Sequence, residues 1–569
     1  MKKILLLMIA TLTLLASCQK PEFVEPTAER QGITSLTAYF TSGTYVDQEL
    51  AKLEISDPDL DRYVIPVPWF FPEESEDVTT IHMTRVRVRA ELANDCKLSP
   101  ALTILDLTQE NHFTYTNAQG ESRDIVITGK RTKSNNGKVM TFSLIEPYKI
   151  EGFVNEEAKE IYLFTTDDLS GFSATATVNA HSEVKDNLTT KKDYNQEQTV
   201  TVIAHDGSEH QYKIIKKYPT KIPYGFRENS VRQLFNFEPV SRLGFPAASV
   251  AVSPSLAYID GSVVVCFGDG TKPVYLDGLT GVKKGEINLG SAVAGSVTSD
   301  EGGNLLITNH AESTEDVNIY RTKSVTAAPE LFYTFNNVTD VPVGYNVKVH
   351  GNIDTDAVII LTHEGVAGIT STSKYTRVVV TGGQVASCET IDLSALSLGW
   401  GEAPAKAAKI VSASATPDNG VMLSYYTPFT GDEHNVLFYV NGKGAIGASL
   451  PFRTNENTLV NTNFNSNVLE SKTYNNATYT ISFITSHFPE WTCKPRLYVF
   501  DTTTPNSIKE GVAVLKNADI EMYQTAASFT AAGDVIMAPS ADGFKVYIYY
   551  FDHNAGVIGG YVADCIDIG

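Results

Sequence analysis

The sequence predicts an all-β protein: two immunoglobulin-like β-sandwiches followed by a β-propeller of six blades, with seven blades as the alternative. Three observations carry this prediction. Short stretches of alternating apolar and polar residues are separated by turns rich in Gly, Asp and Asn. One hairpin pattern occurs twice, about 87 residues apart, and a second turn-and-strand pattern then recurs through the last three-fifths of the chain. Helical periodicity is scarce.

The two hairpins predict the sandwiches. Residues 113–127 and 200–214 are each two alternating strands joined by a polar turn that closes on a glycine, Gly120 or Gly207. Glycine supplies the positive φ that such turns need. Further alternating stretches precede both hairpins. A repeat of this size, built from short strands, predicts immunoglobulin-like domains at residues 34–131 and 135–219.

Beyond a proline-containing linker, residues 230–569 predict the propeller. Turn residues precede short apolar strands at intervals of roughly 40 to 65 residues, about the period of a four-stranded blade. We expect residues 234–237 to supply the strand that closes the ring. The turns are Asp260-Gly261, residues 300–303, residues 354–356, residues 417–420, Asn475-Asn476 and Gly533-Asp534.

The N-terminus has the pattern of a secretory leader. Lys2 and Lys3 precede an apolar run over residues 4–16, which is too short to span a bilayer as a mature helix. The run ends Leu-Ala-Ser-Cys18, which resembles the bacterial lipobox, where the cysteine is lipidated after cleavage. We therefore expect residues 1–17 to be a lipoprotein signal peptide and residues 18–33 a lipidated tether. The alternative is an ordinary signal peptide with a chance cysteine.

Residues 19–22, Gln-Lys-Pro-Glu, resemble the surface-export signal of Bacteroidetes lipoproteins, although Pro21 stands where an acidic residue is usual. We expect a lipid-anchored outer-membrane protein exposed on the cell surface, with a periplasmic orientation as the alternative. The formal net charge is −21, so a duplex would be repelled and a nucleic-acid partner is not expected.

Signatures of catalysis or metal binding are missing from the sequence. There is no HExxH, GxSxG or P-loop motif and no CxxC pair, so we expect no enzyme activity, no cofactor and no metal. Residues 442–447 fit GxGxxG, but Pro451 would stop the helix that a dinucleotide site requires, so a hairpin turn is expected. The turns at Asp300 and Asp418 resemble the Asp-box of sialidase propellers without its terminal aromatic residue.

Three tryptophans are the candidate ligand-binding residues: Trp69, Trp400 and Trp491. Sugars present flat C–H faces that stack on aromatic rings, and loops on a rigid scaffold are where binding residues collect. Trp400 and Trp491 are expected in such loops of the propeller. For Trp69, packing in the core of the first sandwich is the favoured interpretation, and the ligand role is the alternative. His363 follows an apolar strand and is expected to be a structural histidine rather than a residue of the central channel.

As a whole, the chain resembles Bacteroidetes cell-surface lipoproteins of unknown function that combine immunoglobulin-like domains with a propeller. Lipoproteins of this kind often accompany SusC/SusD-type glycan-uptake systems. The resemblance implies a protein that binds extracellular glycan, or scaffolds such a system, without catalysis. Its partners would be a polysaccharide or an envelope protein, and the membrane would be contacted only through the lipid. The alternatives are a protein-interaction or adhesion propeller and a glycan-cleaving enzyme.

Overall fold

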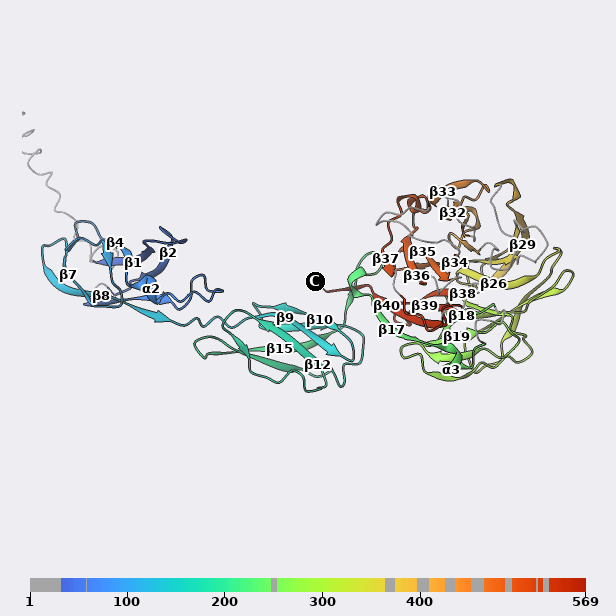
Figure 1. The fold of residues 1–569 in the computed structure, drawn as a ribbon, viewed down its shortest axis with the longest axis horizontal. Coiled ribbons are helices and arrows are strands. Elements are labelled where there is room, and N and C mark those ends of the chain that lie inside the picture. The colour runs from blue at the N-terminus through green and yellow to red at the C-terminus, as the bar shows by residue number, and fades with distance from the viewer. Residues whose placement is uncertain are drawn as a thin grey trace, which may run out of the picture. The chain divides into compact units, whose positions relative to one another are not determined.

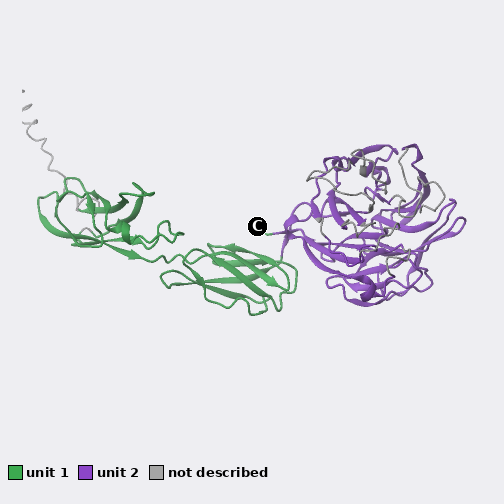
Figure 2. Cartoon of the chain, viewed as in Figure 1, with its two compact units in different colours: residues 1–218, 568–569 green, residues 219–567 purple. Residues whose placement is uncertain are grey.

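A computed structural model describes residues 32–57, 59–246, 253–363, 374–396, 409–424, 435–451, 465–486, 494–517, 520–524 and 532–568. Over these residues the chain is almost entirely β-structure (Figure 1), which confirms the predicted all-β fold. It divides into two compact units, residues 1–218 with 568–569 and residues 219–567 (Figure 2).

The first sandwich of unit 1 pairs two four-stranded sheets, with strand orders β2-β1-β4-β6 and β3-β8-β7-β5. In β3 every second residue is buried, as in Tyr63, Ile65 and Val67, because alternate side chains of a strand face opposite sides. Together with apolar residues of the other sheet they form one core. The elements are β1 (Ile33–Phe40), β2 (Glu49–Glu54), β3 (Arg62–Pro68), α2 (Thr80–Met83), β4 (Val86–Leu92), β5 (Lys97–Ser99), β6 (Ile104–Leu105), β7 (Asn111–Thr116) and β8 (Ser122–Thr132).

The second sandwich is one continuous sheet of order β12-β9-β10-β11-β15-β14-β13 that encloses its own core. It is continuous because β10 pairs with β9 on one side and with β11 on the other. Phe142 of β9 and Ile214 of β15 lie in the same core. The strands are β9 (Val139–Glu146), β10 (Ile150–Asn155), β11 (Glu160–Phe164), β12 (Ser173–Val178), β13 (Glu183–Val184), β14 (Gln198–Ile203) and β15 (Glu209–Lys217).

Both predicted hairpins are present and are confirmed by their pairing. β7 pairs with β8, and β14 pairs with β15, in each case antiparallel. The turn glycines have φ of 85° at Gly120 and 89° at Gly207, in the region that residues with a side chain avoid. The local signal read from the sequence therefore specified these turns.

Unit 2 begins with β16 (Thr220–Lys221), which pairs with β41 (Ile566–Asp567). Six four-stranded antiparallel sheets then occupy the part of this unit that the structure describes. The first three sheets in the chain are β18 (Ser255–Ile259), β19 (Ser262–Cys266), β20 (Val274–Asp277) and β21 (Lys283–Glu286); β22 (Ser296–Ser299), β23 (Leu305–Thr308), β24 (Asp316–Thr322) and β25 (Glu330–Asn336); and β26 (Val343–Gly351), β27 (Ala357–His363), β28 (Lys374–Thr381) and β29 (Gln384–Asp392).

The other three sheets complete the ring. They are β30 (Lys409–Ser412), β31 (Val421–Ser424), β32 (Asn435–Val440) and β33 (Ile446–Pro451); β34 (Asn465–Tyr474), β35 (Ala477–Ser486), β36 (Arg496–Asp501) and β37 (Leu515–Asn517); and β38 (Gly533–Pro539), β39 (Lys545–Asp552), β40 (Val557–Asp564) and β17 (Arg232–Phe237). The short helix α3 (Pro239–Leu243) follows β17, and single 3-10 turns lie at Glu228–Ser230, Ser394–Leu396, Pro417–Asn419 and Pro505–Glu510.

The first strands of successive sheets contact one another in chain order, and β38 contacts β18, which closes the ring of a β-propeller. The last sheet takes its fourth strand from the start of the unit. β17 pairs antiparallel with β40, with Phe235 opposite Gly560, so the prediction that residues 234–237 close the ring is confirmed. Apolar clusters lie between neighbouring sheets, where the two layers face each other.

One part of the predicted repeat is wrong. Five of the six predicted turns lie between the first and second strands of their sheets, but Gly533 and Asp534 instead begin the first strand, β38. The turn that corresponds to the other five follows Pro539. The second and third strands of this sheet, β39 and β40, are joined by residues 553–556. The reason is the closure itself, since the fourth strand comes from the far end of the unit.

Candidate functional site

The ring has two faces, which follow from the antiparallel order of each sheet. Turns between first and second strands, and between third and fourth strands, lie at one face, called here the turn face. Turns between second and third strands, and the connections from one sheet to the next, lie at the opposite loop face. Any binding site built from connections between sheets therefore belongs to the loop face.

The chain enters the ring at the turn face, where residues 222–227 are fixed by side chains. Asn475, in the turn between β34 and β35, donates from Nδ2 to the carbonyls of Ile222 (3.0 Å) and Gly225 (2.8 Å). Arg227 makes two hydrogen bonds to the carboxylate of Asp564, of 2.8 and 3.0 Å. A paired guanidinium and carboxylate of this geometry fixes direction as well as distance. The entry segment is therefore part of the ring.

Four charged side chains fill the axis of the ring, and all are almost completely buried: Lys348 on β26, Glu470 and Lys472 on β34, and Asp534 on β38. The Lys348 ammonium lies 2.8 Å from Asp534 Oδ1 and 3.4 Å from Glu470 Oε2. Lys472 lies 3.8 Å from Glu470 Oε1. Two positive and two negative charges thus meet away from water, which is tolerable only because they compensate one another.

The backbone explains why charges are needed at the axis. Among the described residues, each first strand has one edge that pairs with no other strand, so the carbonyl and N–H groups on that edge need other partners. Lys348 donates to the carbonyl of Val535 at 2.6 Å, and Lys472 donates to the carbonyls of Ser299, at 2.7 Å, and Val349. An ammonium has three donors and can satisfy several carbonyls at once. The lysines therefore join the strand edges.

Acceptors on neighbouring first strands satisfy the edge N–H groups in the same way. Asp534 Oδ2 accepts from the N–H of Leu256 at 2.8 Å, and Ser255 Oγ accepts from that of Val297 at 2.8 Å. His350 connects the sheet that contains β30, because its Nδ1 lies 3.1 Å from the Ser412 carbonyl. Side chains at the axis thereby connect the first strands of all six sheets.

The protonation of this network follows from its surroundings. Burial would lower the pKa of Lys348, but Asp534 and Glu470 outweigh it and hold that pKa above its ordinary value, so the lysine is charged. Burial raises the pKa of Glu470, against the pull of Lys472 and Lys348. Burial and the Lys472 charge lower the pKa of His350, so this histidine is neutral near pH 7.

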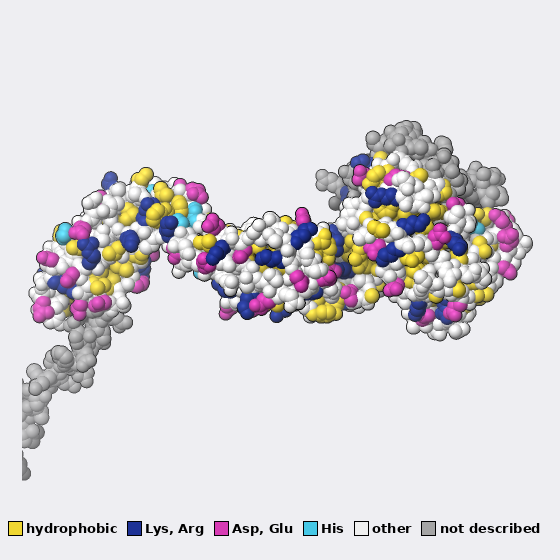
Figure 3. Space-filling model, turned by 90° about the horizontal axis from the view of Figure 1, so that it is seen from below, with side chains coloured by type: hydrophobic (Ala, Val, Ile, Leu, Met, Phe, Trp, Pro, Cys, Tyr) yellow, Lys and Arg dark blue, Asp and Glu magenta, His cyan; other side chains and the backbone are white. Residues whose placement is uncertain are grey.

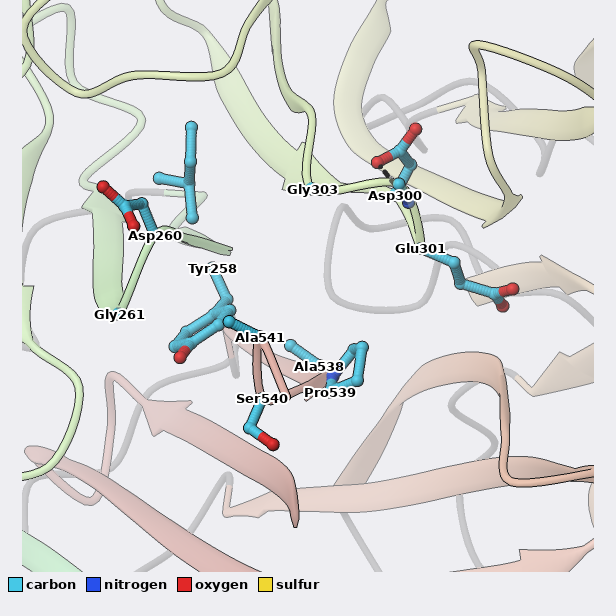
Figure 4. Close-up of a pocket in the computed structure, with 12 residues that line it drawn as sticks. Tyr258, Asp260, Gly261, Asp300, Glu301, Gly303, Ala538, Pro539, Ser540 and Ala541 are labelled. Atoms are coloured by element: carbon cyan, nitrogen blue, oxygen red, sulfur yellow. Dashed lines mark hydrogen bonds between the residues drawn. The ribbon is translucent and has the colours of Figure 1, made fainter. Parts of the chain in front are cut away.

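A small pocket of about 280 Å³ opens at the turn face, between the first turns of three neighbouring sheets (Figure 4). Its wall contains three glycines and two alanines, together with Tyr258, Ile259, Asp260, Pro539 and Ser540. Its other acidic groups are already engaged. Asp300 accepts from the N–H groups of Gly302 and Asn304, and Glu301 points away from Asp260 in Figure 4 and accepts from the N–H of Thr473 at 2.8 Å. The pocket offers shape rather than a reactive group.

The turn at Asp300, which resembles an Asp-box, has a structural role. Asp300 bonds within its own turn and also accepts from the N–H of Ile353 at 2.8 Å, so it ties two sheets together. Residues 442–447 likewise form a turn between β32 and β33 and the first two residues of β33, so a hairpin follows as predicted and not a helix. The positive φ of this turn is at Gly444 (75°). Both motifs are structural turns.

Three histidines lie at or just after the end of the second strand of their sheets, at the loop face: His310, His363 and His553. His310 stacks on Tyr345 with ring centroids 3.6 Å apart, and His363 Nε2 lies 2.9 Å from Thr376 Oγ1. Burial lowers the pKa of both His310 and His363 to about 4. They are neutral packing groups, in agreement with the structural role expected for His363.

Of the predicted ligand residues, only Trp69 is among the described residues. It is half-buried just after β3 and is not part of the core of the first sandwich, so the interpretation as a core residue is wrong. The Arg131 guanidinium lies 3.8 Å from the ring centroid, and His205 of the second sandwich meets the ring edge-on at 5.8 Å. The adjacent Phe70 stacks on His181 at 3.9 Å. These rings form a joint between the two sandwiches, and a ligand role for Trp69 stays a prediction.

Trp400, Trp491 and Cys18 lie outside the described residues. Trp400 belongs to the connection between β29 and β30, and Trp491 to the one between β35 and β36. The strand ends that flank both connections lie at the loop face, because of the antiparallel order of the sheets.

Sequence reasoning missed the axial network. A signal was present, since Lys348 lies between Val347 and Val349, and Glu470 and Lys472 lie in a strand that continues from Val468 and Leu469. A charge inside a buried strand requires a partner. The sequence does not say which partner, because Lys348 and Glu470 are 122 positions apart.

Among the described residues, no three or more His, Cys, Asp or Glu side chains gather in a way that could hold a metal ion. None of the described helices is long and apolar enough to cross a membrane. On the face that Figure 3 shows, lysines and arginines are interspersed with acidic side chains over both units.

Residues 233–564 match a family described as a domain of unknown function, DUF8500. The chain belongs to the DUF8500 family. The matched region runs from β17 to the end of β40 and so spans the ring of sheets that the DUF8500 domain forms. Two further domains of unknown function match unit 1: DUF5018 over residues 13–129 and DUF8499 over residues 139–216.

No curated protein matches the chain. Among solved structures, a DUF4623 family protein from Bacteroides eggerthii is 13% identical, with a TM-score of 0.43 over 76% of this chain and 100% of its own. A putative secreted protein from Bacteroides fragilis is 14% identical, with a TM-score of 0.14 over 19% of this chain and 100% of its own. An α-L-arabinanase from Penicillium chrysogenum complexed with arabinobiose is 10% identical, with a TM-score of 0.34 over 59% and 99%.

Proposed function

We propose that the chain is a lipid-anchored protein of the outer membrane, displayed at the cell surface, whose DUF8500 domain binds extracellular glycan at its loop face without cleaving it. Cys18 carries the lipid in this proposal, and Trp400 and Trp491 stack on sugar rings. The ligand is a polysaccharide, and the lipid is the only contact with the membrane. No cofactor takes part.

One observation carries the proposal: the polypeptide enters the ring at the turn face, where Asn475 and Arg227 fix it, whereas the connections that contain both tryptophans join strands at the loop face. A ring held by one face leaves the other free for a large ligand. The axis supports binding over cleavage, because both of its carboxylates, Glu470 and Asp534, are buried against lysines. Glycoside cleavage needs a pair of acids that reach the substrate.

The test uses the mature chain from Gln19 without its lipid. In affinity gels that each contain one polysaccharide, at least one polysaccharide should retard the parent. The double variant Trp400→Ala with Trp491→Ala should bind that polysaccharide about tenfold more weakly, as expected when stacked aromatic area is lost. Reducing ends should not accumulate during incubation. Unchanged retardation in the double variant would remove the loop face as the site, and released reducing ends would show a glycan-cleaving enzyme.

A further inference from the structure

The outer surface of the second sandwich carries a cluster of three aromatic side chains: Phe153 on β10, and Tyr162 and Phe164 on β11. The sheet register places Phe153 directly opposite Tyr162. Ile161 and Leu163, which alternate with the two residues of β11, are completely buried in the core. Alternate side chains of a strand face opposite sides, so the aromatic residues lie on the outside.

The rings form one continuous apolar surface. Phe153 and Tyr162 have ring planes parallel to within 7°, with centroids 6.4 Å apart, and Tyr162 and Phe164 are 6.0 Å apart. The Lys217 ammonium lies 5.0 Å from the Tyr162 centroid. Phe153 is 42% exposed, so its ring is the accessible end of the cluster. Tyr162 and Phe164 are half-buried. Aromatic side chains that gather at a surface in this way are candidates for a binding surface.

Polar side chains also lie outside the core on β10 and on the strands that follow it in the sheet, β9 and β12. Hydroxyl side chains of β9 and β12 form a row in which Ser143 is paired with Thr175 and Thr141 with Thr177. The same Ser143 is opposite Glu151 of β10, two residues before Phe153. These hydroxyls and the carboxylate supply hydrogen-bond donors and acceptors beside an apolar strip.

The charges around the cluster balance. Glu160 accepts a hydrogen bond from the Tyr162 hydroxyl at 2.5 Å and is paired in the sheet with Lys213. Lys217 is paired with Phe164. A polymer of one sign would require a surface of the opposite sign, and none is present here. The surface therefore fits an uncharged ligand.

We propose that this aromatic cluster and its hydroxyl border, together called the sandwich strip, form a binding surface for a neutral polysaccharide. Sugar rings offer C–H faces to the aromatic side chains and hydroxyl groups to Ser143, Thr175 and Glu151. The strip shares the ligand class of the proposed function, but it consists of its own residues and does not require that the loop face bind. A chain with two such sites holds a long polymer by avidity.

The test compares three variants of the mature, lipid-free chain in affinity gels with neutral polysaccharides: a strip variant, a loop variant and a matched control. The strip variant carries Phe153→Ala and Tyr162→Ala, and the loop variant carries Trp400→Ala and Trp491→Ala. The control carries Met140→Ala and Ile145→Ala, which remove exposed apolar side chains from β9 of the same sandwich. Unfolding temperatures of the strip variant and the control should match the parent, because their changes are at exposed or half-exposed positions of unit 1.

We expect the strip variant to bind at least one neutral polysaccharide about tenfold more weakly than the parent, while the control binds unchanged. Added salt should not alter the difference. Equal binding by the strip variant and the parent, with weaker binding by the loop variant, would overturn the sandwich strip alone. Loss only in the strip variant would overturn the loop face alone. If sedimentation shows self-association that the strip variant removes, the strip joins two copies of the chain and the inference is wrong.

Discussion

The second sandwich and the ring place their charged side chains in opposite ways. In the sandwich, ion pairs such as Lys185 with Glu209 are half-exposed and the interior is apolar. In the ring, Lys348 and Glu470 are at the centre, and apolar clusters lie between the sheets around them. The difference shows that buried charged side chains occur where the edges of strands lack backbone partners. A sandwich turns its edges to water, whereas a closed ring turns one edge of every sheet inward, where protein groups must take the place of water.

Removing one charge from the axis should have the largest effect. Lys348→Met leaves Asp534 and Glu470 buried with one lysine between them and removes the donor to the Val535 carbonyl. We expect the free energy of unfolding of unit 2 to fall by about 3–5 kcal/mol. Urea titration followed by fluorescence measures this change.

A second substitution isolates the cause of that loss. Adding Asp534→Asn restores electrical neutrality and keeps an oxygen that can accept from the N–H of Leu256. Part of the lost stability should return. If Lys348→Met alone costs less than about 1 kcal/mol, the axis does not depend on its charges, and the comparison with the sandwich fails.

The buried His310 at the loop face should make unit 2 less stable in acid. The pKa of His310 is about 4 because of burial, whereas an unfolded chain has an ordinary histidine pKa near 6.5. Between about pH 6.5 and pH 4 this histidine is protonated in the unfolded state but not in the folded state. Its contribution to the free energy of unfolding is therefore complete above about pH 6.5 and is lost as the pH falls towards 4. The loss amounts to about 3 kcal/mol for this group.

Unfolding measured at pH 7 and pH 4.5 checks this expectation. His310→Phe keeps a ring against Tyr345 and should flatten the pH dependence of unit 2. The exposed His112 of the first sandwich provides the control, because His112→Gln should leave that dependence as it is. An identical slope in His310→Phe and the parent would show that other groups cause the acid sensitivity.

The smallest effect is expected on the surface of the second sandwich. Lys185 lies 2.6 Å from Glu209, and the two side chains are 50% and 51% exposed. Such pairs contribute little because water competes for both partners, so Lys185→Ala should change stability by less than about 1 kcal/mol. Thermal unfolding in low and high salt measures it. A loss as large as that of Lys348→Met would mean that burial is not what separates the two regions.

Local patterns allowed much of the fold to be predicted. The glycines at 120 and 207 indicated both hairpins, and the turns before apolar strands indicated five of the sheets in the correct phase. The sixth sheet was assigned out of phase, although the segment that closes it was recognised. Turn chemistry acts over a few residues and is visible in the sequence, whereas the pairing of β17 with β40 joins opposite ends of unit 2.

The candidate sites were harder to predict than the fold. For Trp69 the sequence allows either a ligand residue or a core residue. The structure places it between Arg131 and His205 at the joint of the sandwiches. The sequence does not distinguish Phe153 from a buried strand residue, because the same amino acid occurs at both kinds of position. Its neighbour Tyr162 becomes visible only through the register of β10 and β11.

The sequence by itself determined the all-β class and the positions of most turns, because each depends on the chemistry of a few consecutive residues. Tertiary structure alone decided which strand completes the ring, which charges neutralise one another at the axis and which aromatic side chains share a surface. Those outcomes depend on groups far apart in the chain that meet only when sheets pack, and burial then sets how strongly they interact.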